Sequence, residues 1–154
     1  VNNAISNPLK ASKFGLPFRH VPTYLAGYYK YKAGDQFTEG GKPVNGKRDI
    51  CDIYAIMYET SESVPTLDGT NAFTSPNLIS TARINNAKET NEWTYFKLPF
   101  TTLPGKFIDK KKLMDGKYNI AIVFTSSLEG DHFNGAIGST LLIDEAELIY
   151  HSED

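Results

Sequence analysis

Disulfides, long apolar runs and an excess of one charge are all missing from this 154-residue sequence. Its single cysteine, Cys51, excludes a disulfide within the chain. No apolar run approaches the length of a membrane span. The 16 Lys and Arg residues nearly balance the 18 Asp and Glu residues, and no basic face indicates a nucleic-acid partner. Composition therefore predicts a soluble, globular protein with one domain.

Helical periodicity is also nearly absent, because only residues 108–113 are compatible with a short helix. The sequence instead contains strand candidates separated by turns rich in Gly and Pro. These candidates lie at residues 24–32, 49–59, 78–84, 93–100, 118–124 and 140–150. Since no helices are available to form crossovers, the pattern predicts an all-β fold, an antiparallel two-sheet jelly-roll sandwich.

The segments around these strands define the expected domain limits. Residues 1–22 show no sustained period and are predicted to be a linker that leads into a sandwich spanning residues 23–154. The chain starts at Val1 without an initiator Met or an apolar signal segment, so we expect a fragment of a longer protein. Residues 40–47 are predicted to be a turn region, in which Asn45 and Gly46 indicate a hairpin, and residues 61–77 are predicted to be a polar loop.

Alternation assigns the side chains of the strand at residues 49–59 to two faces. One face is wholly apolar, with Cys51, Ile53, Ala55 and Met57, and the other is aromatic with one acid, with Ile50, Asp52, Tyr54, Ile56 and Tyr58. In the same way, the strand at residues 93–100 directs Trp93 and Tyr95 outward and Phe96 inward.

An aromatic and polar sheet face is suited to binding sugars, because pyranose rings stack on aromatic rings while polar side chains hold the hydroxyls. The sequence predicts such a ligand face from Asp52, Tyr54, Tyr58, Arg83, Trp93 and Tyr95. The alternative is structural, since tyrosine is a strong strand former whose ring packs beside its neighbours while its hydroxyl reaches water.

Residues 126–139 form a long connection between two strands, and long ordered loops are often functional. Three side chains of this loop are candidates for ligand contacts: Asp131, His132 and Asn134. The alternative is a turn-rich connection in which Phe133 fills the core and three glycines supply positive φ: Gly130, Gly135 and Gly138.

Metal and catalytic signals are weak. The three histidines share no short spacing, which argues against zinc. Acids at 144, 145 and 147 either help to hold calcium or solvate one side of a strand. No Gly-x-Ser-x-Gly motif is present, and Cys51 falls on an apolar face. A glycoside hydrolase would need two carboxylates, for which Asp52 and Asp131 are the candidates.

Several segments carry a resemblance to a known family: LAGYYKY at 25–31, DICDIYAIMY at 49–58, TAR at 81–83, WTYFKLPF at 93–100, SSLEGD at 126–131, GAIGS at 135–139 and LID at 142–144. From about Tyr24 onward the chain resembles the putative carbohydrate-metabolism domain family of secreted or surface proteins of gut bacteria. The resemblance implies a jelly roll similar to carbohydrate-binding modules. It also implies an extracytoplasmic location, periplasmic or at the cell surface, and an immunoglobulin-like domain N-terminal to this one. It supplies no catalytic residues.

Three functions follow from these observations, in order of preference. The first is a glycan-binding domain whose partner is an oligo- or polysaccharide. The second is an adhesion or scaffold module that docks a neighbouring protein domain. The third is a glycoside hydrolase or lyase that uses Asp52 and Asp131. We expect no nucleic-acid partner, no membrane span in this chain and no cofactor, with calcium left open.

Overall fold

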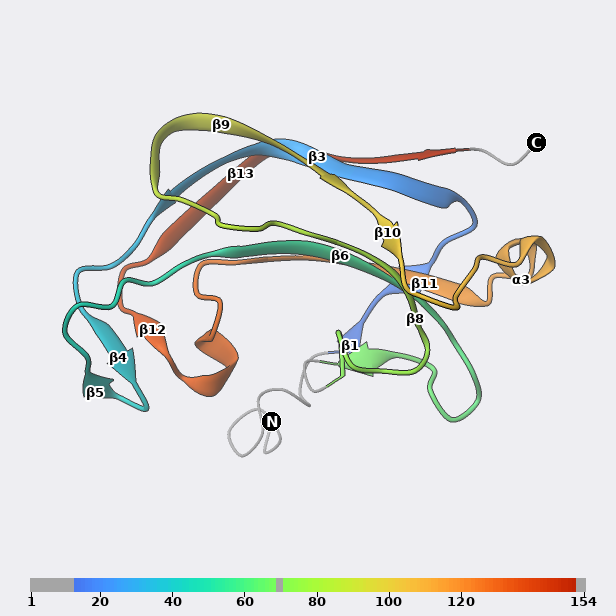
Figure 1. Ribbon diagram of the computed structural model, residues 1–154, viewed down its shortest axis with the longest axis horizontal. Coiled ribbons are helices and arrows are strands. Elements are labelled where there is room, and N and C mark those ends of the chain that lie inside the picture. Colours follow the sequence, from blue (N-terminus) through green and yellow to red (C-terminus); the bar gives the residue numbers. More distant parts are fainter. Residues whose placement is uncertain (1–12, 69–70, 152–154) are drawn as a thin grey trace.

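The computed structural model describes residues 13–68 and 71–151 and shows two curved antiparallel sheets stacked on each other (Figure 1). The five-stranded sheet has the order β10 (Thr101–Thr102), β8 (Leu78–Arg83), β6 (Asp52–Glu59), β11 (Tyr118–Thr125) and β2 (Leu16–Pro17). The three-stranded sheet has the order β13 (Thr140–His151), β3 (Val21–Lys32) and β9 (Thr90–Pro99). This arrangement confirms the predicted all-β sandwich.

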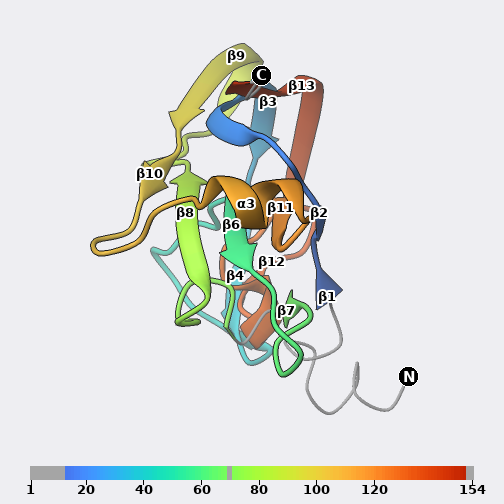
Figure 2. The same ribbon diagram turned by 90° about the vertical axis from the view of Figure 1, so that its right-hand side faces the viewer.

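Smaller elements close the two ends of the sandwich (Figures 1 and 2). One end carries a small sheet of β12 (Gly135–Ala136), β4 (Phe37–Glu39) and β5 (Lys42–Pro43), together with the 3-10 turn η1 (Gly130–His132). The other end carries the helix α3 (Lys110–Met114), which confirms the short helix expected near residues 108–113. The pair β1 (Lys13–Phe14) and β7 (Leu67–Asp68) lies beneath the five-stranded sheet.

The predicted linker contributes to the sheets, unlike the expectation from the sequence. Within residues 13–22, β1 pairs with β7, β2 pairs with β11, and β3 already begins at Val21. These pairs are short, so they leave no alternating pattern in the sequence. Residues 1–12 lie outside the described part of the chain.

The hairpin turn lies within the predicted turn region, but at a different pair of residues. The chain reverses between β4 and β5 at Gly40 and Gly41, whose φ angles are 57° and 84°. Positive φ at both central residues is the geometry of the tight turn that matches strand twist, and glycine adopts it without strain. Asn45 and Gly46 form a separate turn after β5.

The main core lies between the two sheets. The apolar face of β6 packs there as predicted, with Ile53 and Ala55 against Leu25, Tyr29 and Phe96 of the opposite sheet. Inward Phe96 and outward Tyr95 confirm the alternation predicted for β9. Tyr31 is buried at the end of this core, where its hydroxyl donates to the carbonyl of Ser126 at 2.7 Å. Burial raises the pKa of Tyr31 to about 12, which keeps the hydroxyl a donor.

A second core covers much of the other face of β6, which the sequence predicted to be exposed. The described parts of the segment after β6, residues 60–68 and 71–77, bury Leu67 and Ala72 against Ile56 and Tyr58 of the five-stranded sheet. The predicted polar loop is present as an irregular connection, but it also contributes buried side chains that its composition did not indicate. Because β6 is buried on both faces, its tyrosines are largely withdrawn from solvent.

Cys51 is buried in the main core, and this burial raises the pKa of its thiol from 9.0 to about 11. At pH 8 such a thiol carries roughly 100-fold less thiolate than an unperturbed one. We expect Ellman's reagent to label the native protein at least ~100-fold more slowly than the urea-unfolded chain. A Ser63→Cys variant in a Cys51→Ala background provides an exposed control. Equal labelling rates for native and unfolded Cys51 would contradict this burial.

Within residues 13–68 and 71–151, no helix has the length and apolar character needed to cross a membrane.

Candidate functional site

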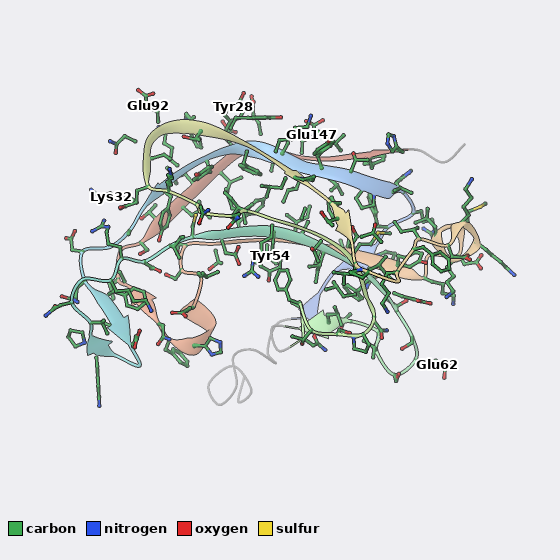
Figure 3. All side chains as sticks on the ribbon, viewed as in Figure 1. Tyr28, Lys32, Tyr54, Glu62, Glu92 and Glu147 are labelled. Atoms are coloured by element: carbon green, nitrogen blue, oxygen red, sulfur yellow. The ribbon has the colours of Figure 1, made fainter. Side chains whose placement is uncertain are left out.

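The structure distributes the sequence-predicted site residues over three places. Tyr54 projects from the concave outer face of the five-stranded sheet, whereas Trp93 and Tyr95 belong to the convex outer face of the three-stranded sheet. Figure 3 shows Tyr54 just below the five-stranded sheet, and Tyr28, the cross-strand neighbour of Tyr95, above the three-stranded sheet. The tyrosines of β6 and the aromatic residues of β9 therefore do not form the single ligand face predicted from the sequence, because their strands belong to different sheets.

A cluster on the concave face, which we call the Arg83 site, consists of Asp52, Tyr54, Phe73 and Arg83. Antiparallel register places Arg83 of β8 directly opposite Tyr54 of β6. Arg83 Nη2 donates to Asp52 Oδ2 at 2.7 Å, and its Nε donates to Oδ1 at 3.2 Å. The guanidinium carbon lies 4.2 Å from the centre of the Phe73 ring and 5.6 Å from that of Tyr54. The cluster therefore holds one cation between a carboxylate and two rings.

The two charges of this site differ in their access to solvent. The Asp52 side chain is 5% exposed, whereas that of Arg83 is 42% exposed. A buried carboxylate is costly unless a cation and hydrogen bonds compensate it, and Arg83 supplies both. Bidentate geometry also fixes the plane of the guanidinium. Arg83 thus presents an oriented donor to solvent at the margin of the covering segment.

Tyr58, predicted as a ligand residue, has a structural role instead. Its side chain is fully buried, and its hydroxyl accepts a hydrogen bond from Asn119 Nδ2 at 3.1 Å. Gly15 lies so close that a Cβ there would be 2.7 Å from the same hydroxyl. This tyrosine therefore supports the sheet from a position that solvent does not reach in this structure.

The loop at residues 126–139 lies at the end of the sandwich that carries β4 and β12. Asn134 Oδ1 accepts from the backbone N–H of Gly40 at 3.1 Å, which joins the loop to the β4–β5 turn. The His132 side chain is exposed at the end of η1, and the side chain of Asp131 lies outside the described part. The loop follows Thr125, which pairs with Asp52 of the Arg83 site in the register of β6 and β11.

Phe133 does not fill the core as the structural alternative for this loop expected. Its side chain is 65% exposed, and its φ of 60° places it in the left-handed region. Of the three glycines in the loop, only Gly138 has a positive φ. Gly135 is required for another reason, because a Cβ there would lie 2.8 Å from Ser127 Oγ.

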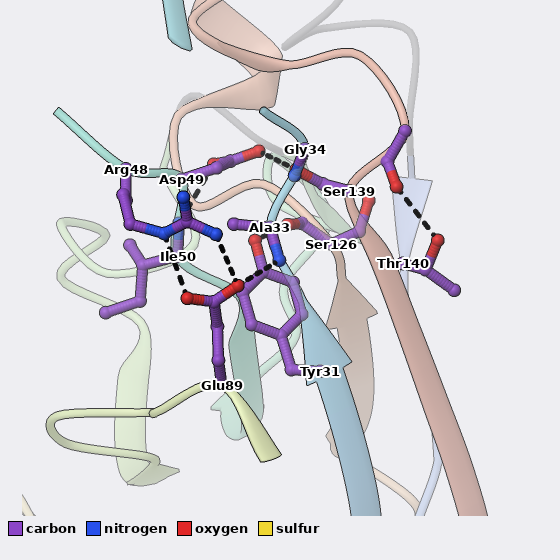
Figure 4. A network of polar contacts seen from close by, with 11 residues as sticks. Tyr31, Ala33, Gly34, Arg48, Asp49, Ile50, Glu89, Ser126, Ser139 and Thr140 are labelled. Atoms are coloured by element: carbon purple, nitrogen blue, oxygen red, sulfur yellow. Dashed lines mark hydrogen bonds and ion pairs between the residues drawn. The ribbon is translucent and has the colours of Figure 1, made fainter. Parts of the chain in front are cut away.

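Asp49 holds this loop to the body of the sandwich, and the sequence did not single it out. Its buried Oδ2 accepts from Ser127 Oγ at 2.5 Å, Ser139 Oγ at 2.6 Å and the Ala136 N–H at 3.0 Å. Figure 4 shows Asp49 within a wider polar network at this end. All these partners are more than 70 positions away, so no local spacing indicates the cluster.

An exposed ion pair in the same network resembles the Arg83 pair. Arg48 Nε and Nη2 donate to the two carboxylate oxygens of Glu89 at 2.9 and 2.7 Å. This hydrogen bonding from Arg48 lowers the pKa of Glu89, which also accepts from the Ala33 N–H. Unlike Arg83, Arg48 stacks on no ring among the described contacts, which makes it a matched control.

Candidate metal ligands are scattered over the part of the chain that the structure describes. No three His, Cys, Asp or Glu residues there are grouped to hold a metal ion. A cavity of about 100 Å³ beside α3 includes Glu59, which pairs with Lys112 at 2.8 Å. This volume is well below the ~300 Å³ or more of ordinary small-molecule sites. Of the two candidate hydrolase acids, Asp52 is paired with Arg83 and the Asp131 side chain is not described.

These features define a jelly-roll β-sandwich domain with a polar and aromatic cluster on its concave face. The chain belongs to the family described as Putative carbohydrate metabolism domain, whose model matches residues 1–149. The match includes the lead-in residues that the sequence separated from the domain.

Two solved structures are similar to this chain. One, described as a putative glycoside hydrolase from Bacteroides thetaiotaomicron VPI-5482, is 87% identical with a TM-score of 0.97, over 99% of this chain and 45% of the other. The second, described as a putative glycoside hydrolase from Bacteroides vulgatus ATCC 8482, is 45% identical with a TM-score of 0.92, over 97% and 60% of the respective chains. This chain thus spans less than two thirds of either relative. No curated protein sequence matches it.

Proposed function

We propose that this domain binds carbohydrate at the Arg83 site without cleaving it. The observation that carries the proposal is a partly exposed guanidinium that Asp52 orients and that lies against the rings of Phe73 and Tyr54. The family match supports a role connected with carbohydrate. From the family resemblance we further propose that the domain is extracytoplasmic and that an immunoglobulin-like domain neighbours it.

The chemistry of the Arg83 site suits a sugar. A guanidinium has five N–H donors in a fixed plane, and the two bonds to Asp52 leave others for ligand hydroxyls. The half-buried Phe73 ring beside these donors offers apolar surface to the C–H face of a pyranose, and the buried Tyr54 ring supports the guanidinium. Since the ion pair already fixes the donor, binding requires little further ordering of this side chain.

Binding is favoured over hydrolysis by the state of the site's carboxylate. Glycoside hydrolysis requires two carboxyl groups about 5–9.5 Å apart, one of which takes or gives a proton. At the Arg83 site, Asp52 is buried and both of its oxygens accept from Arg83. An acid held in this way is poorly placed for proton transfer. The names of the two similar structures keep hydrolysis as the alternative to exclude.

A glycan array tests this proposal. The double variant Asp52→Asn/Arg83→Gln removes both charges together and so avoids an unpaired buried carboxylate. Because a hydrogen bond to a charged group contributes about 1.5–3 kcal/mol, we expect the variant to lose roughly 10- to 100-fold in affinity for the glycans that the wild type binds. Phe73→Ala is expected to weaken the same glycans.

The matched control is Arg48→Gln, which removes a bidentate arginine at the other place. Its array profile should equal that of the wild type, and circular dichroism should show every variant folded. Wild-type signals that persist in Asp52→Asn/Arg83→Gln would exclude the Arg83 site. A blank array for the folded wild type would favour protein docking, and release of reducing sugar from a bound glycan would restore the hydrolase hypothesis.

A further inference from the structure

Four aromatic side chains form a row on the convex face of the three-stranded sheet: Tyr24, Tyr28, Trp93 and Tyr95. Trp93 and Tyr95 alternate outward along β9 and are 44% and 54% exposed. In cross-strand register, Tyr28 lies opposite Tyr95, and Tyr24 lies opposite Pro99. Their common direction follows from strand alternation, because the intervening side chains face the main core. We call this set the convex aromatic row.

Neighbouring contacts define the positions of these rings. The centres of the Tyr28 and Tyr95 rings are 5.2 Å apart. Lys30 Nζ lies 4.9 Å from the Trp93 ring, and Lys97 Nζ lies 4.4 Å from the Tyr24 ring. All of these side chains come from paired strands, so the row is a surface on a rigid sheet.

The charges around the row favour a hydrated ligand over a protein partner. Charges of both signs lie near the rings. The positive side chains are Lys30, Lys32 and Lys97, and the negative ones are Glu92, Asp144 and Glu147. The cores of protein–protein interfaces are depleted in Lys, Glu and Asp, because these groups are costly to desolvate. A hydrated ligand avoids this cost, since its hydroxyls replace water at the charged groups while its apolar face contacts the rings. Because positive and negative side chains are mixed around the row, their electrostatic potentials largely cancel. The surface therefore favours a neutral ligand over an ionic one.

The dimensions of the row favour a chain over a single sugar. Tyr24, at one end of the row, lies opposite Pro99 of β9. Trp93, at the other end, is six positions away from Pro99 on the same strand. At about 3.3 Å per residue, the row extends over roughly 20 Å. A surface of this length accommodates several linked sugar units.

We infer that the convex aromatic row is a second carbohydrate surface, which binds an extended neutral polysaccharide on the side of the sandwich opposite the Arg83 site. This inference goes beyond the proposed function, because the two surfaces belong to different sheets and act independently. The row holds the chain of a polymer, whereas the Arg83 site recognises individual sugar units.

Affinity electrophoresis tests this inference with native gels that contain a soluble β-glucan, a xylan, a galactomannan or an α-glucan. Wild-type protein should be retarded by at least one polymer. The double variant Trp93→Ala/Tyr95→Ala should lose about tenfold in affinity for it, from two lost ring contacts. Raising the salt concentration should leave wild-type retardation unchanged. Phe107→Ala/Phe133→Ala, which removes two exposed rings elsewhere, is the control and should migrate as the wild type.

The Asp52→Asn/Arg83→Gln variant, run in the same gels, separates the two proposals. Retardation lost only in Trp93→Ala/Tyr95→Ala supports the row, and the glycan array then decides the Arg83 site separately. Retardation lost only in Asp52→Asn/Arg83→Gln overturns the row and supports the Arg83 site. Loss in both double variants supports both surfaces. Absence of retardation for wild-type protein in every gel overturns the row, and pull-down of a second protein through Trp93 would assign it to docking instead.

Discussion

Replacement of Asp49 by Ala is expected to lower the free energy of unfolding by about 3–5 kcal/mol. The carboxylate is buried, and one of its oxygens accepts from Ser127, Ser139 and the Ala136 N–H. Without it, these donors lose their partner at partly or fully buried positions, where each unsatisfied group costs about 1–3 kcal/mol. Urea denaturation measures the loss.

The same variant should release the loop at residues 126–139 before the sheets unfold. Hydrogen exchange should therefore rise at Ala136 in Asp49→Ala, while the amides of β6 remain protected. Asp35→Ala, which removes an exposed carboxylate nearby in the sequence, is the control and should change stability by less than about 0.5 kcal/mol. If Asp49→Ala changed stability as little as this control, Asp49 would not hold the loop.

Replacement of Arg83 by Met is expected to destabilise the protein by about 2 kcal/mol at neutral pH. The change leaves the buried carboxylate of Asp52 without its cation, although the 42% exposure of the Arg83 side chain shows that water reaches the pair. We therefore expect the free energy of unfolding to fall by less than the 3–5 kcal/mol that is typical when a fully buried ion pair is broken. The double variant Asp52→Asn/Arg83→Met should recover most of the stability, because it removes the unpaired charge.

Arg48→Met is the matched control for this cycle, because the Arg48–Glu89 pair has the same bidentate geometry at an exposed position. Arg48→Met should lower the free energy of unfolding by less than about 1 kcal/mol, as is usual for surface ion pairs. Equal losses for Arg83→Met and Arg48→Met, or no recovery in the double variant, would show that Asp52 is not compensated by Arg83.

Much of the fold could be predicted from the sequence, because strand alternation reports directly on burial. The apolar face of β6 and the inward Phe96 of β9 follow from period-two patterns that each strand carries in itself. The cover over the other face of β6 could not be predicted in this way. Leu67 and Ala72 are the buried residues of an irregular segment, and without a period they gave no sign of packing.

The candidate site could be predicted only in part, for a related reason. The sequence selected Asp52, Tyr54 and Arg83, and the structure brings these three together. It also grouped Trp93 with them, because alternation shows that a side chain points outward without showing from which sheet. Asp49 was missed since its partners are distant in the chain, and only the strand pairing brings them together.

The most direct test of glycan recognition at the concave face is a crystal structure of the domain with an oligosaccharide selected on the array. The proposal predicts sugar density within hydrogen-bonding distance of the Arg83 guanidinium, with the Asp52–Arg83 pair intact and a sugar ring against Phe73. Density at any other surface, with the Arg83 site occupied by solvent alone, would contradict it.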